Sequence, residues 1–514
     1  MERTLTHLSY RPAGTHLELD ADVVVVGSGA GGAACAHTLA QAGLSVIVVE
    51  AGPWRTPPEM PDDFYGALRD LFDDWQSTVT IGRALWPVVQ ARAVGGTTVI
   101  NSAICVRTPL KVIESWGQEH GLDARHYAQE LERHQADLER EIGVEDAVGE
   151  VLGRHNELAI EGAAKLGHTD PPMRRFVQDC EGRGRCTMGC KAGRKQSMDL
   201  TLLPRAMQHG ATVVSCAPVR KIGFEGRRAS GVTGYFVHPL TRRKGASFQI
   251  RARRAVVLAA SATHTPALMR RSGLKAKSVG AQFRAHPGNG VLGVYPDVVD
   301  LNRGATQGWS SLAHDGVKLE TLALPLEMLA ARLPGGGTAL MRRLARSRHV
   351  SHLVQGLNAT TVGRVGVGFG GRPTIRYTMN RPDLYRLRAG FHLLARQHIA
   401  AGATSIMPGI AGIPPELLPD EIDQILDVPL QPTRFLCILS HLFGGAVMGR
   451  DPKTSATDPL GRVWNTEGLI VACAAAIPTT LGVNPQHTIM ALARMRAEEI
   501  VEDGPGRRPT QRRS

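Results

Sequence analysis

Short apolar runs alternate with longer segments of helical periodicity along much of the chain. The run at 22–26 is apolar and β-branched, and a second run at 45–50 follows a small-residue segment that Gly43 would end as a helix C-cap. Runs of this kind are typical of parallel strands buried on both faces, and their alternation with helices at both chain ends predicts an α/β fold. Further strands are predicted at 211–215, 255–259 and 469–475, and helices at 127–141, 156–166, 384–400 and 488–501.

A glycine-rich turn stands between the first predicted strand and the helix that follows it. Its pattern is Gly27-x-Gly29-x-x-Gly32. Gly27 permits a tight turn, Gly29 lets a pyrophosphate approach the backbone, and Gly32 lets the helix pack closely on the strand. Glu50, at the end of the second strand, can accept hydrogen bonds from ribose hydroxyls. The unit predicts a dinucleotide-binding site and does not distinguish FAD from NAD.

Four further regions of the chain resemble signatures of the glucose–methanol–choline (GMC) oxidoreductases, in the order in which that family carries them. They are residues 92–101, residues 195–201, residues 261–266 with Ser272-Gly273, and residues 441–445 with 482–489. The second region, Lys-Gln-Ser-Met-Asp-Leu-Thr, resembles the cholesterol oxidase branch and the long-chain alcohol oxidases in particular. Members of the family bind FAD and oxidise alcohols. The resemblance therefore implies an FAD-dependent enzyme that removes a hydride from a CH–OH group.

The resemblance also implies which residues contact the cofactor. Gly95 and Gly96 allow backbone N–H groups to reach a phosphate or a flavin edge, and Asn101 offers both donors and acceptors to a heteroaromatic ring. Cys473 stands where the family often has Asp, so a cofactor contact there would come from the backbone. Val219 is expected beside the adenine. The full expected set is Gly27, Gly29, Gly32, Glu50, Arg92, Gly95, Gly96, Asn101, Val219, Cys473 and Asn484.

The same resemblance assigns the proton chemistry of alcohol oxidation. His441 matches the general base, a role that suits imidazole because its ordinary pKa of about 6.5 lies near working pH. Asn484 matches the position that holds the substrate hydroxyl in line. One alternative is that Asn484, which precedes Pro485, caps the helix predicted at 488–501. His487 would replace or assist Asn484 or serve as a supporting group, and His264 is expected to be structural.

Three cysteines with the spacing C-x5-C-x3-C lie in an irregular Gly- and Arg-rich segment at 171–194. They are Cys180, Cys186 and Cys190. Their spacing allows three thiolates to converge on a 3Fe–4S cluster, and the flavoprotein subunit of certain bacterial sugar dehydrogenases in the family carries such a cluster at a similar segment. Free thiols are the main alternative, and zinc is disfavoured because it usually takes four ligands. With a cluster, electrons would pass to an acceptor protein or a quinone.

The order of the motifs predicts a discontinuous Rossmann-like FAD-binding domain with an inserted α+β substrate-binding domain. The predicted parts are FAD-binding segments at 18–125 and 196–287, a helical and Cys-rich segment at 126–195, a cap domain at 288–440, an FAD-binding and catalytic segment at 441–505, and a disordered basic tail at 506–514.

The chain is basic, with a formal charge of +13, but only 5% of its residues are aromatic and it has no nucleic-acid-binding motif. No nucleic-acid partner is therefore expected. The chain opens without an apolar signal segment and has no apolar run of about 18 residues. These features predict a cytoplasmic protein, or one that is peripheral to a membrane.

An apolar segment at 322–333 precedes a basic one at 341–349. An apolar entrance to the active site that faces lipid would explain both segments. It favours a bulky hydrophobic substrate, such as a sterol, long-chain alcohol or terpenoid. A core helix beside a solvated basic face explains them as well. Three other functions stay open: a sugar dehydrogenase with an iron–sulfur relay, a flavin-dependent lyase or photodecarboxylase, and a flavin-binding protein without catalysis.

Overall fold

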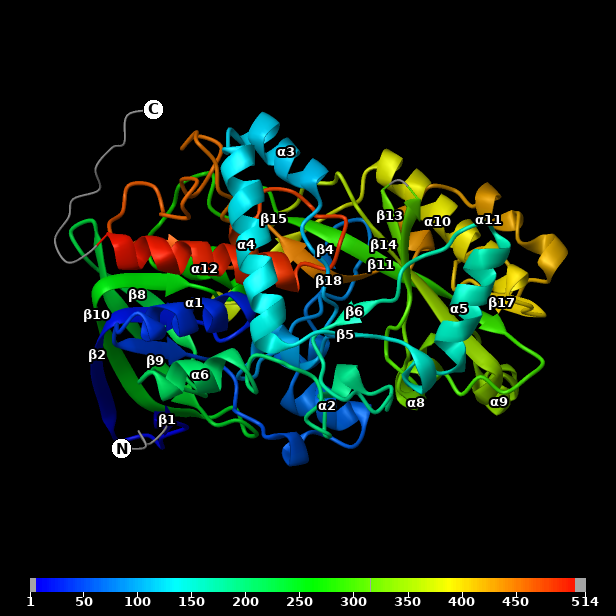
Figure 1. Cartoon of the computed structure of the whole chain (residues 1–514), viewed down its shortest axis with the longest axis horizontal. Helices are drawn as coiled ribbons and strands as arrows, with labels where there is room; N and C mark the ends of the chain where they lie inside the picture. The colour runs from blue at the N-terminus through cyan, green and yellow to red at the C-terminus, as the bar shows by residue number, and fades with distance from the viewer. Residues whose placement is uncertain (1–5, 315, 504–514) are drawn as a thin grey trace.

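The chain forms two lobes, each built around its own β-sheet (Figure 1). The computed structural model describes residues 6–314 and 316–503. The first lobe is assembled from segments at both ends of the chain, and most of the second lies between β11 (Arg284–Val294) and β18 (Ile438–Phe443). The predicted α/β class with an inserted second domain is confirmed. The predicted tail at 506–514 lies outside the described residues.

The first sheet has eight described strands, in the order β1-β7-β3-β2-β10-β9-β8, and β19 pairs with β10. The pairs from β1 to β10 and the pair with β19 are parallel, whereas the β8–β9–β10 edge is antiparallel. Valines 23 to 26 are buried, as expected for a central parallel strand. The strands are β1 Thr6–Leu8, β2 His16–Val26, β3 Val46–Val49, β7 Thr212–Val214, β8 Val219–Glu225, β9 Arg228–Val237, β10 Lys244–Leu258 and β19 Leu469–Val471.

Strand β10 is much longer than predicted. The sequence prediction covered 255–259, whereas the strand begins at Lys244 and pairs with both β2 and β9. Exposed and buried residues alternate between 247 and 252, so this part of the strand faces solvent on one side. A search for continuous apolar runs misses a strand of this type.

Four helices of the first lobe pack together in one connected group. Helix α1 contacts both α6 and α12, and α12 in turn contacts α4. Gly43 follows the end of α1 in a left-handed conformation (φ +85°), which is the backbone geometry expected of its predicted terminating role, although the C-cap itself is Ala42. These helices are α1 Ala30–Gln41, α4 Ala124–Ile142, α6 Leu202–Gln208 and α12 Gln486–Glu502.

The second sheet has six described strands in the order β12-β13-β14-β11-β17, and β18 pairs with β11. Helices α5 and α10 pack against it. The predicted domain boundaries at 287/288 and 440/441 fall inside β11 and β18, which pair with each other. The remaining elements of this sheet and its helices are β12 Ser310–His314, β13 Val317–Thr321, β14 Val350–Leu357, β17 Ser405–Met407, α5 Arg154–Lys165, α8 Leu326–Arg332, α9 Gly337–Ala345, α10 Arg381–Ala400 and α11 Gln424–Asp427.

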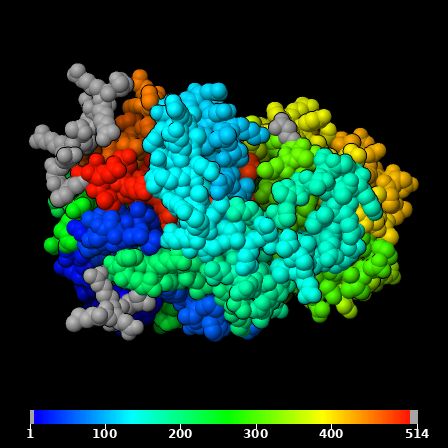
Figure 2. Space-filling view, in the orientation of Figure 1, coloured from blue at the N-terminus to red at the C-terminus, as the bar shows by residue number. Residues whose placement is uncertain are grey.

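The segment 110–165 spans both lobes on the face shown in Figure 2. Its helix α4 packs against α12 of the first lobe, and its helix α5 packs against α10 of the second. No helix among the described residues is both long enough and apolar enough to cross a bilayer. The smaller elements are α2 Phe64–Asp70, α3 Leu110–His120, the pair β5 Glu145–Asp146 with β6 Arg174–Arg175, and the three-stranded sheet of β4 Thr80–Ile81, β15 Arg364–Val367 and β16 Pro373–Arg376.

The apolar segment at 322–333 contributes both to a cavity wall and to a buried cluster, and its predicted contact with lipid stays a prediction. Leu322, Leu324 and Met328 line the large cavity described below, while Leu324, Leu329 and Leu333 belong to a buried cluster. The basic stretch after it is partly neutralised, since Arg346 pairs with Glu416 and Arg348 with Asp300.

Candidate active site

A cavity of about 740 Å³ is lined by residues of both lobes and lies within the usual size range of ligand pockets. Its wall runs from the glycine-rich turn to the inner face of the second sheet. Ten of the twelve predicted cofactor and catalytic residues lie in this wall, and Gly32 and Gly95 lie behind it. The ten are Gly27, Gly29, Glu50, Arg92, Gly96, Asn101, Val219, His441, Cys473 and Asn484.

The three glycines of the turn differ in the space that a side chain would have. A Cβ on Gly27 would lie 2.5 Å from the Ala259 carbonyl oxygen, and one on Gly32 would lie 1.9 Å from the Gly27 carbonyl oxygen. A Cβ on Gly29 would meet no protein atom closer than 3.8 Å. Gly27 and Gly32 are therefore required by the fold, whereas the open side of Gly29 leaves room for a ligand.

Helix α1 begins at the cavity wall without a side-chain cap. Its first N–H groups and its partial positive charge suit a pyrophosphate. Together with the space beside Gly29 and the length of the cavity, this arrangement fits a dinucleotide whose far end reaches His441.

Glu50 braces the turn. Its carboxylate accepts hydrogen bonds from the Ser28 N–H (3.0 Å), the Ser28 hydroxyl (2.7 Å) and the Gly52 N–H (2.8 Å). Burial raises the pKa of Glu50, and these bonds oppose the rise. The residue also lies in the cavity wall, so its predicted bond to a ribose stays a prediction.

The 92–101 segment is tied to the same turn. The Gly95 N–H donates to the Ser28 hydroxyl (3.1 Å), and Gly95 and Gly96 both have positive φ. The Asn101 amide donates to the Gln486 side chain (2.5 Å) and accepts from the Ala103 N–H (3.0 Å). The amide is therefore held in one orientation at the start of α12.

The predicted catalytic pair comes together at the other end of the cavity. His441 Nε2 lies 3.5 Å from Asn484 Nδ2. Helix α12 begins at Gln486 with Pro485 as its N-cap residue, and no side chain caps it, so the capping alternative for Asn484 is wrong. Its side-chain oxygen accepts a hydrogen bond from Lys318 Nζ instead.

The other two histidines have separate surroundings. His487 is buried outside the cavity wall, where its Nε2 donates to the Gln135 carbonyl oxygen (3.1 Å). It therefore does not lie in the cavity beside Asn484. His264 does lie in the wall and pairs with Asp73 (2.8 Å).

A buried ion pair beside Asn484 was not predicted. Lys318 and Glu320 on β13 are each 5% exposed, and their charged groups lie 2.8 Å apart. Glu320 also lies in the cavity wall. The available signal was the alternation Val-Lys-Leu-Glu-Thr at 317–321, which places both charges on one face of a strand.

His286 is a third unpredicted residue. Its Nδ1 lies 3.3 Å from His441 Nδ1, and its Nε2 accepts the Gly482 N–H at 3.0 Å. Burial lowers the pKa of His441 to about 4, with Glu320 raising it and Lys318 lowering it. Burial, His441 and Lys318 together hold the pKa of His286 well below its usual range. Both imidazoles are therefore neutral at pH 7.

The three cysteines surround two buried cations. Arg175 donates to the sulfurs of Cys180 (3.6 Å) and Cys186 (3.2 Å), and the Lys195 N–H donates to the sulfur of Cys190 (3.4 Å). Burial alone would raise the pKa of the Cys186 thiol, but Arg175 and Lys195 lower it. These cations suit any negatively charged sulfur, so the iron–sulfur cluster stays a prediction.

The fold and the cavity define a dinucleotide-binding protein. Residues 21–288 match the N-terminal domain of GMC oxidoreductases, and residues 370–493 match the C-terminal domain. The chain therefore belongs to the GMC oxidoreductase family, and its cofactor is FAD.

Relatives and solved structures agree with this assignment. An uncharacterized GMC-type oxidoreductase of Mycobacterium tuberculosis is 35% identical over 94% of this chain and 76% of its own length. A long-chain-alcohol oxidase of Arabidopsis thaliana is 26% identical over 93% of this chain and 67% of its own length. The fold is similar to pyridoxine 4-oxidase from Mesorbium loti (TM-score 0.72, 18% identity, 93% of this chain and 98% of that one). It is also similar to formate oxidase of Aspergillus oryzae RIB40 (TM-score 0.71, 16% identity, 96% and 99%).

The two contrasting glycines give a first test. Gly32→Ala should lower the stability of the FAD-free protein by about 1–3 kcal/mol, because its methyl group overlaps the Gly27 carbonyl. Gly29→Ala should leave that stability unchanged and lose FAD, because its methyl group fills the space left for the pyrophosphate. Urea unfolding of the apoprotein and flavin absorbance per polypeptide measure the two effects. A Gly29→Ala protein that retains FAD at wild-type stoichiometry would contradict this assignment.

The buried ion pair gives a second test. Lys318→Met should lower the free energy of unfolding by about 3–5 kcal/mol, because it leaves the Glu320 charge buried without a partner. The double change Lys318→Met with Glu320→Leu should recover most of that loss. Arg154→Met, which breaks exposed pairs with Glu157 and Glu161, is the matched control and should cost less than about 1 kcal/mol. Equal losses of unfolding free energy in Lys318→Met and Arg154→Met would show that the Lys318–Glu320 pair does not contribute this energy.

Proposed function

We propose that this GMC oxidoreductase oxidises the CH–OH group of a bulky hydrophobic alcohol, such as a sterol, a long-chain alcohol or a terpenoid. The observation that supports this substrate is the composition of the cavity wall around the catalytic pair. Apolar side chains of α8, of the segment before it, of β18 and of the residues just before β18 contribute to this wall beside its polar groups: Leu322, Leu324, Met328, Leu436, Ile438 and Leu442. The name of the Arabidopsis long-chain-alcohol oxidase is consistent with such a substrate.

Exposed apolar side chains near the cavity support the same class of substrate. Phe369 is fully exposed, and Gly371, two residues later, lies in the cavity wall. Trp75 is exposed between Asp74 and Gln76, which are both wall residues, and it packs edge-on against exposed Tyr65. An alcohol held in a membrane or a micelle would meet an apolar surface at this edge, which fits a membrane-peripheral enzyme.

The chemistry follows from the groups at the catalytic end. Bound FAD supplies the acceptor for the hydride that leaves the carbinol carbon. Asn484, held by Lys318, orients the substrate hydroxyl, and neutral His441 takes its proton.

Glu320 is a second candidate for the proton acceptor, and the hydrogen bond from Gly482 favours it. Because that N–H donates to His286 Nε2, neutral His286 carries its proton on Nδ1, which faces His441 Nδ1. When His286 donates across this contact, His441 holds its own proton on Nε2 and donates to the substrate oxygen. In that tautomer the 3.5 Å contact with Asn484 Nδ2 is not a hydrogen bond, because both groups are donors. The carboxylate of Glu320, in the same wall, would then accept the hydroxyl proton.

Single substitutions separate these two roles. His441→Ala should retain FAD and slow flavin reduction by alcohol at least about a hundredfold, the usual size of a general-base effect. Anaerobic bleaching of the flavin band with sterols, fatty alcohols and sugars measures the rate and the substrate class. His392→Ala, which removes only a pair with exposed Asp423, is the control. If Glu320→Gln is as slow as His441→Ala or slower, Glu320 is the acceptor, and wild-type rates in both variants would overturn the proposed chemistry.

The pH profile tests the environment of His441. Its pKa of about 4 leaves the imidazole neutral from pH 8 down to pH 5, so the proton-accepting form is present throughout this range. The rate of flavin reduction should therefore stay level over this range and fall only as the pH approaches 4. Stopped-flow reduction with flavin content checked at each pH provides the measurement. A loss of half the rate near pH 6.5 would show that His441 titrates as an ordinary solvated imidazole.

A further inference from the structure

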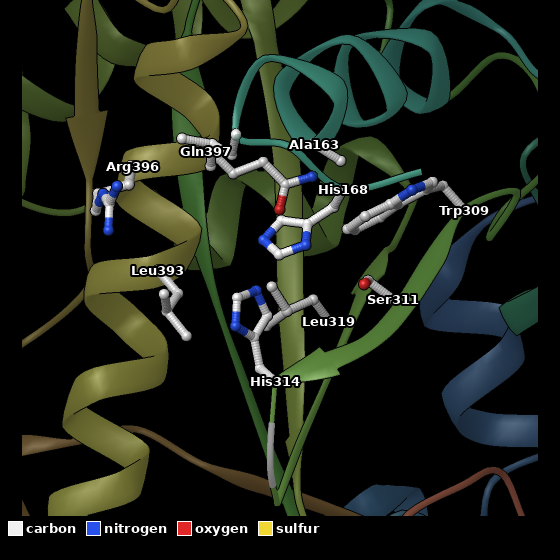
Figure 3. A pocket seen from close by; sticks show the side chains of 10 residues that line it. Ala163, His168, Trp309, Ser311, His314, Leu319, Leu393, Arg396 and Gln397 are labelled. Atoms are coloured by element: carbon white, nitrogen blue, oxygen red, sulfur yellow. The ribbon is translucent and has the colours of Figure 1, made fainter. Parts of the chain in front are cut away.

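A second, smaller cavity of about 220 Å³ lies in the outer part of the second lobe. It is enclosed by the end of α5 and the residues after it, by α10, and by strands β12 and β13 (Figure 3). Its volume is below that of pockets for drug-sized ligands, so it suits a small molecule. The lining residues are Ala163, Leu166, His168, Trp309, Ser311, His314, Leu319, Leu393, Arg396 and Gln397.

This cavity lies behind the strand that carries the active-site ion pair. Successive side chains of a strand point to opposite faces. Lys318 and Glu320 point toward Asn484 and the large cavity, and Leu319 between them lines the small one. The two cavities are therefore separate and share β13 as a wall.

Some polar groups of the small cavity have partners and others have none: Gln397 donates to the Ala159 carbonyl oxygen, and Ser311 accepts from the Ala313 N–H. Arg396 is an exposed residue at the edge of the cavity, and within 6–314 and 316–503 it forms no ion pair or hydrogen bond. The indole N–H of buried Trp309 has no acceptor among the same residues.

The rings of His168 and His314 contact each other, with centroids 4.9 Å apart at an angle of 70°. Burial, His168 and Arg396 lower the pKa of His314, and Asp170, outside the lining, opposes this shift. Figure 3 shows the two imidazoles facing each other between Trp309 on one side and Arg396 on the other.

These groups favour an anion over a metal ion. No lining residue is acidic, and Arg396 supplies a permanent positive charge that would repel a cation. A planar guanidinium pairs well with a carboxylate, and the N–H groups of the imidazoles and of Trp309 can donate to its oxygens. Leu166, Leu319, Leu393 and the Trp309 ring supply apolar walls for an organic body.

We propose that this cavity binds a small organic carboxylate, at a site distinct from the catalytic cavity. The carboxylate group would pair with Arg396, and its apolar part would pack against Trp309 and Leu319. This site does not depend on the proposed alcohol substrate.

The test adds benzoate, phenylacetate or isobutyrate to the full-length FAD-loaded protein and measures the binding of each probe by isothermal titration calorimetry. At least one probe should bind, and benzamide, the neutral counterpart of benzoate, should bind at least about tenfold more weakly than benzoate does. Arg396→Gln should weaken carboxylate binding by about tenfold or more, the size expected for a lost charge-assisted hydrogen bond. Arg381→Gln, which changes an exposed arginine on the same helix, should leave the affinity unchanged.

Two further measurements separate this site from the catalytic cavity. Binding at the proposed site should leave the flavin absorbance band unshifted and should persist in His441→Ala. His314→Gln, in the wall of the small cavity, should weaken binding as Arg396→Gln does. Absence of binding by all three carboxylates at millimolar concentration overturns the proposal. So does binding that Arg396→Gln and His314→Gln leave intact, or binding that shifts the flavin band and is lost in His441→Ala.

Discussion

Close backbone contact at the glycine-rich turn is the constraint on which the rest of the site depends. Gly32 lies against the Gly27 carbonyl, and Gly27 lies against the end of β10, at distances that admit no side chain. This contact fixes where α1 begins, and so fixes the direction of its uncapped N–H groups. Ser28, inside the turn, then joins Glu50 to Gly95 by hydrogen bonds. The two cofactor-binding segments thus keep one spacing because a single hydroxyl connects them.

The second lobe completes the site through buried charge. Lys318 reaches from β13 to Asn484, and its ammonium is shared between that amide and Glu320. Burying an ion pair costs several kcal/mol of desolvation, so such a pair is weak evidence for stability alone. Its position beside the catalytic amide gives it a specific role, since it fixes which atom of Asn484 faces His441. The nitrogen of the amide is left to face the imidazole and any bound hydroxyl.

Sequence reasoning found the parts of the site whose signal is local. The spacing of Gly27, Gly29 and Gly32 can be explained locally, because each glycine meets a steric requirement that arises within a few residues of it. His441 and Asn484 were found through resemblance, and the structure places them 3.5 Å apart although 42 residues separate them in the chain. The alternation at 317–321 places Lys318 and Glu320 on one face of a strand, but their approach to Asn484 depends on a distant segment. His286 was missed because its partners His441 and Gly482 also lie far away in the chain. The capping alternative for Asn484 failed for a related reason, since Lys318 supplies the partner of its side-chain oxygen.

The cysteine loop shows how a buried cation can tie an irregular segment to a functional one. The ammonium of Lys195 donates to the carbonyl oxygens of Val99 (2.5 Å), Asn101 (2.9 Å) and Cys186 (2.9 Å). Two of these acceptors belong to the cofactor-binding segment and the third to the cysteine loop. A buried ammonium without acceptors is costly, so displacement of the Cys186 backbone would leave Lys195 short of a partner. The same cation lowers the pKa of the Cys186 thiol. Lys195 therefore holds the loop against the segment that ends at Asn101, and it acts together with Arg175 on the Cys186 sulfur.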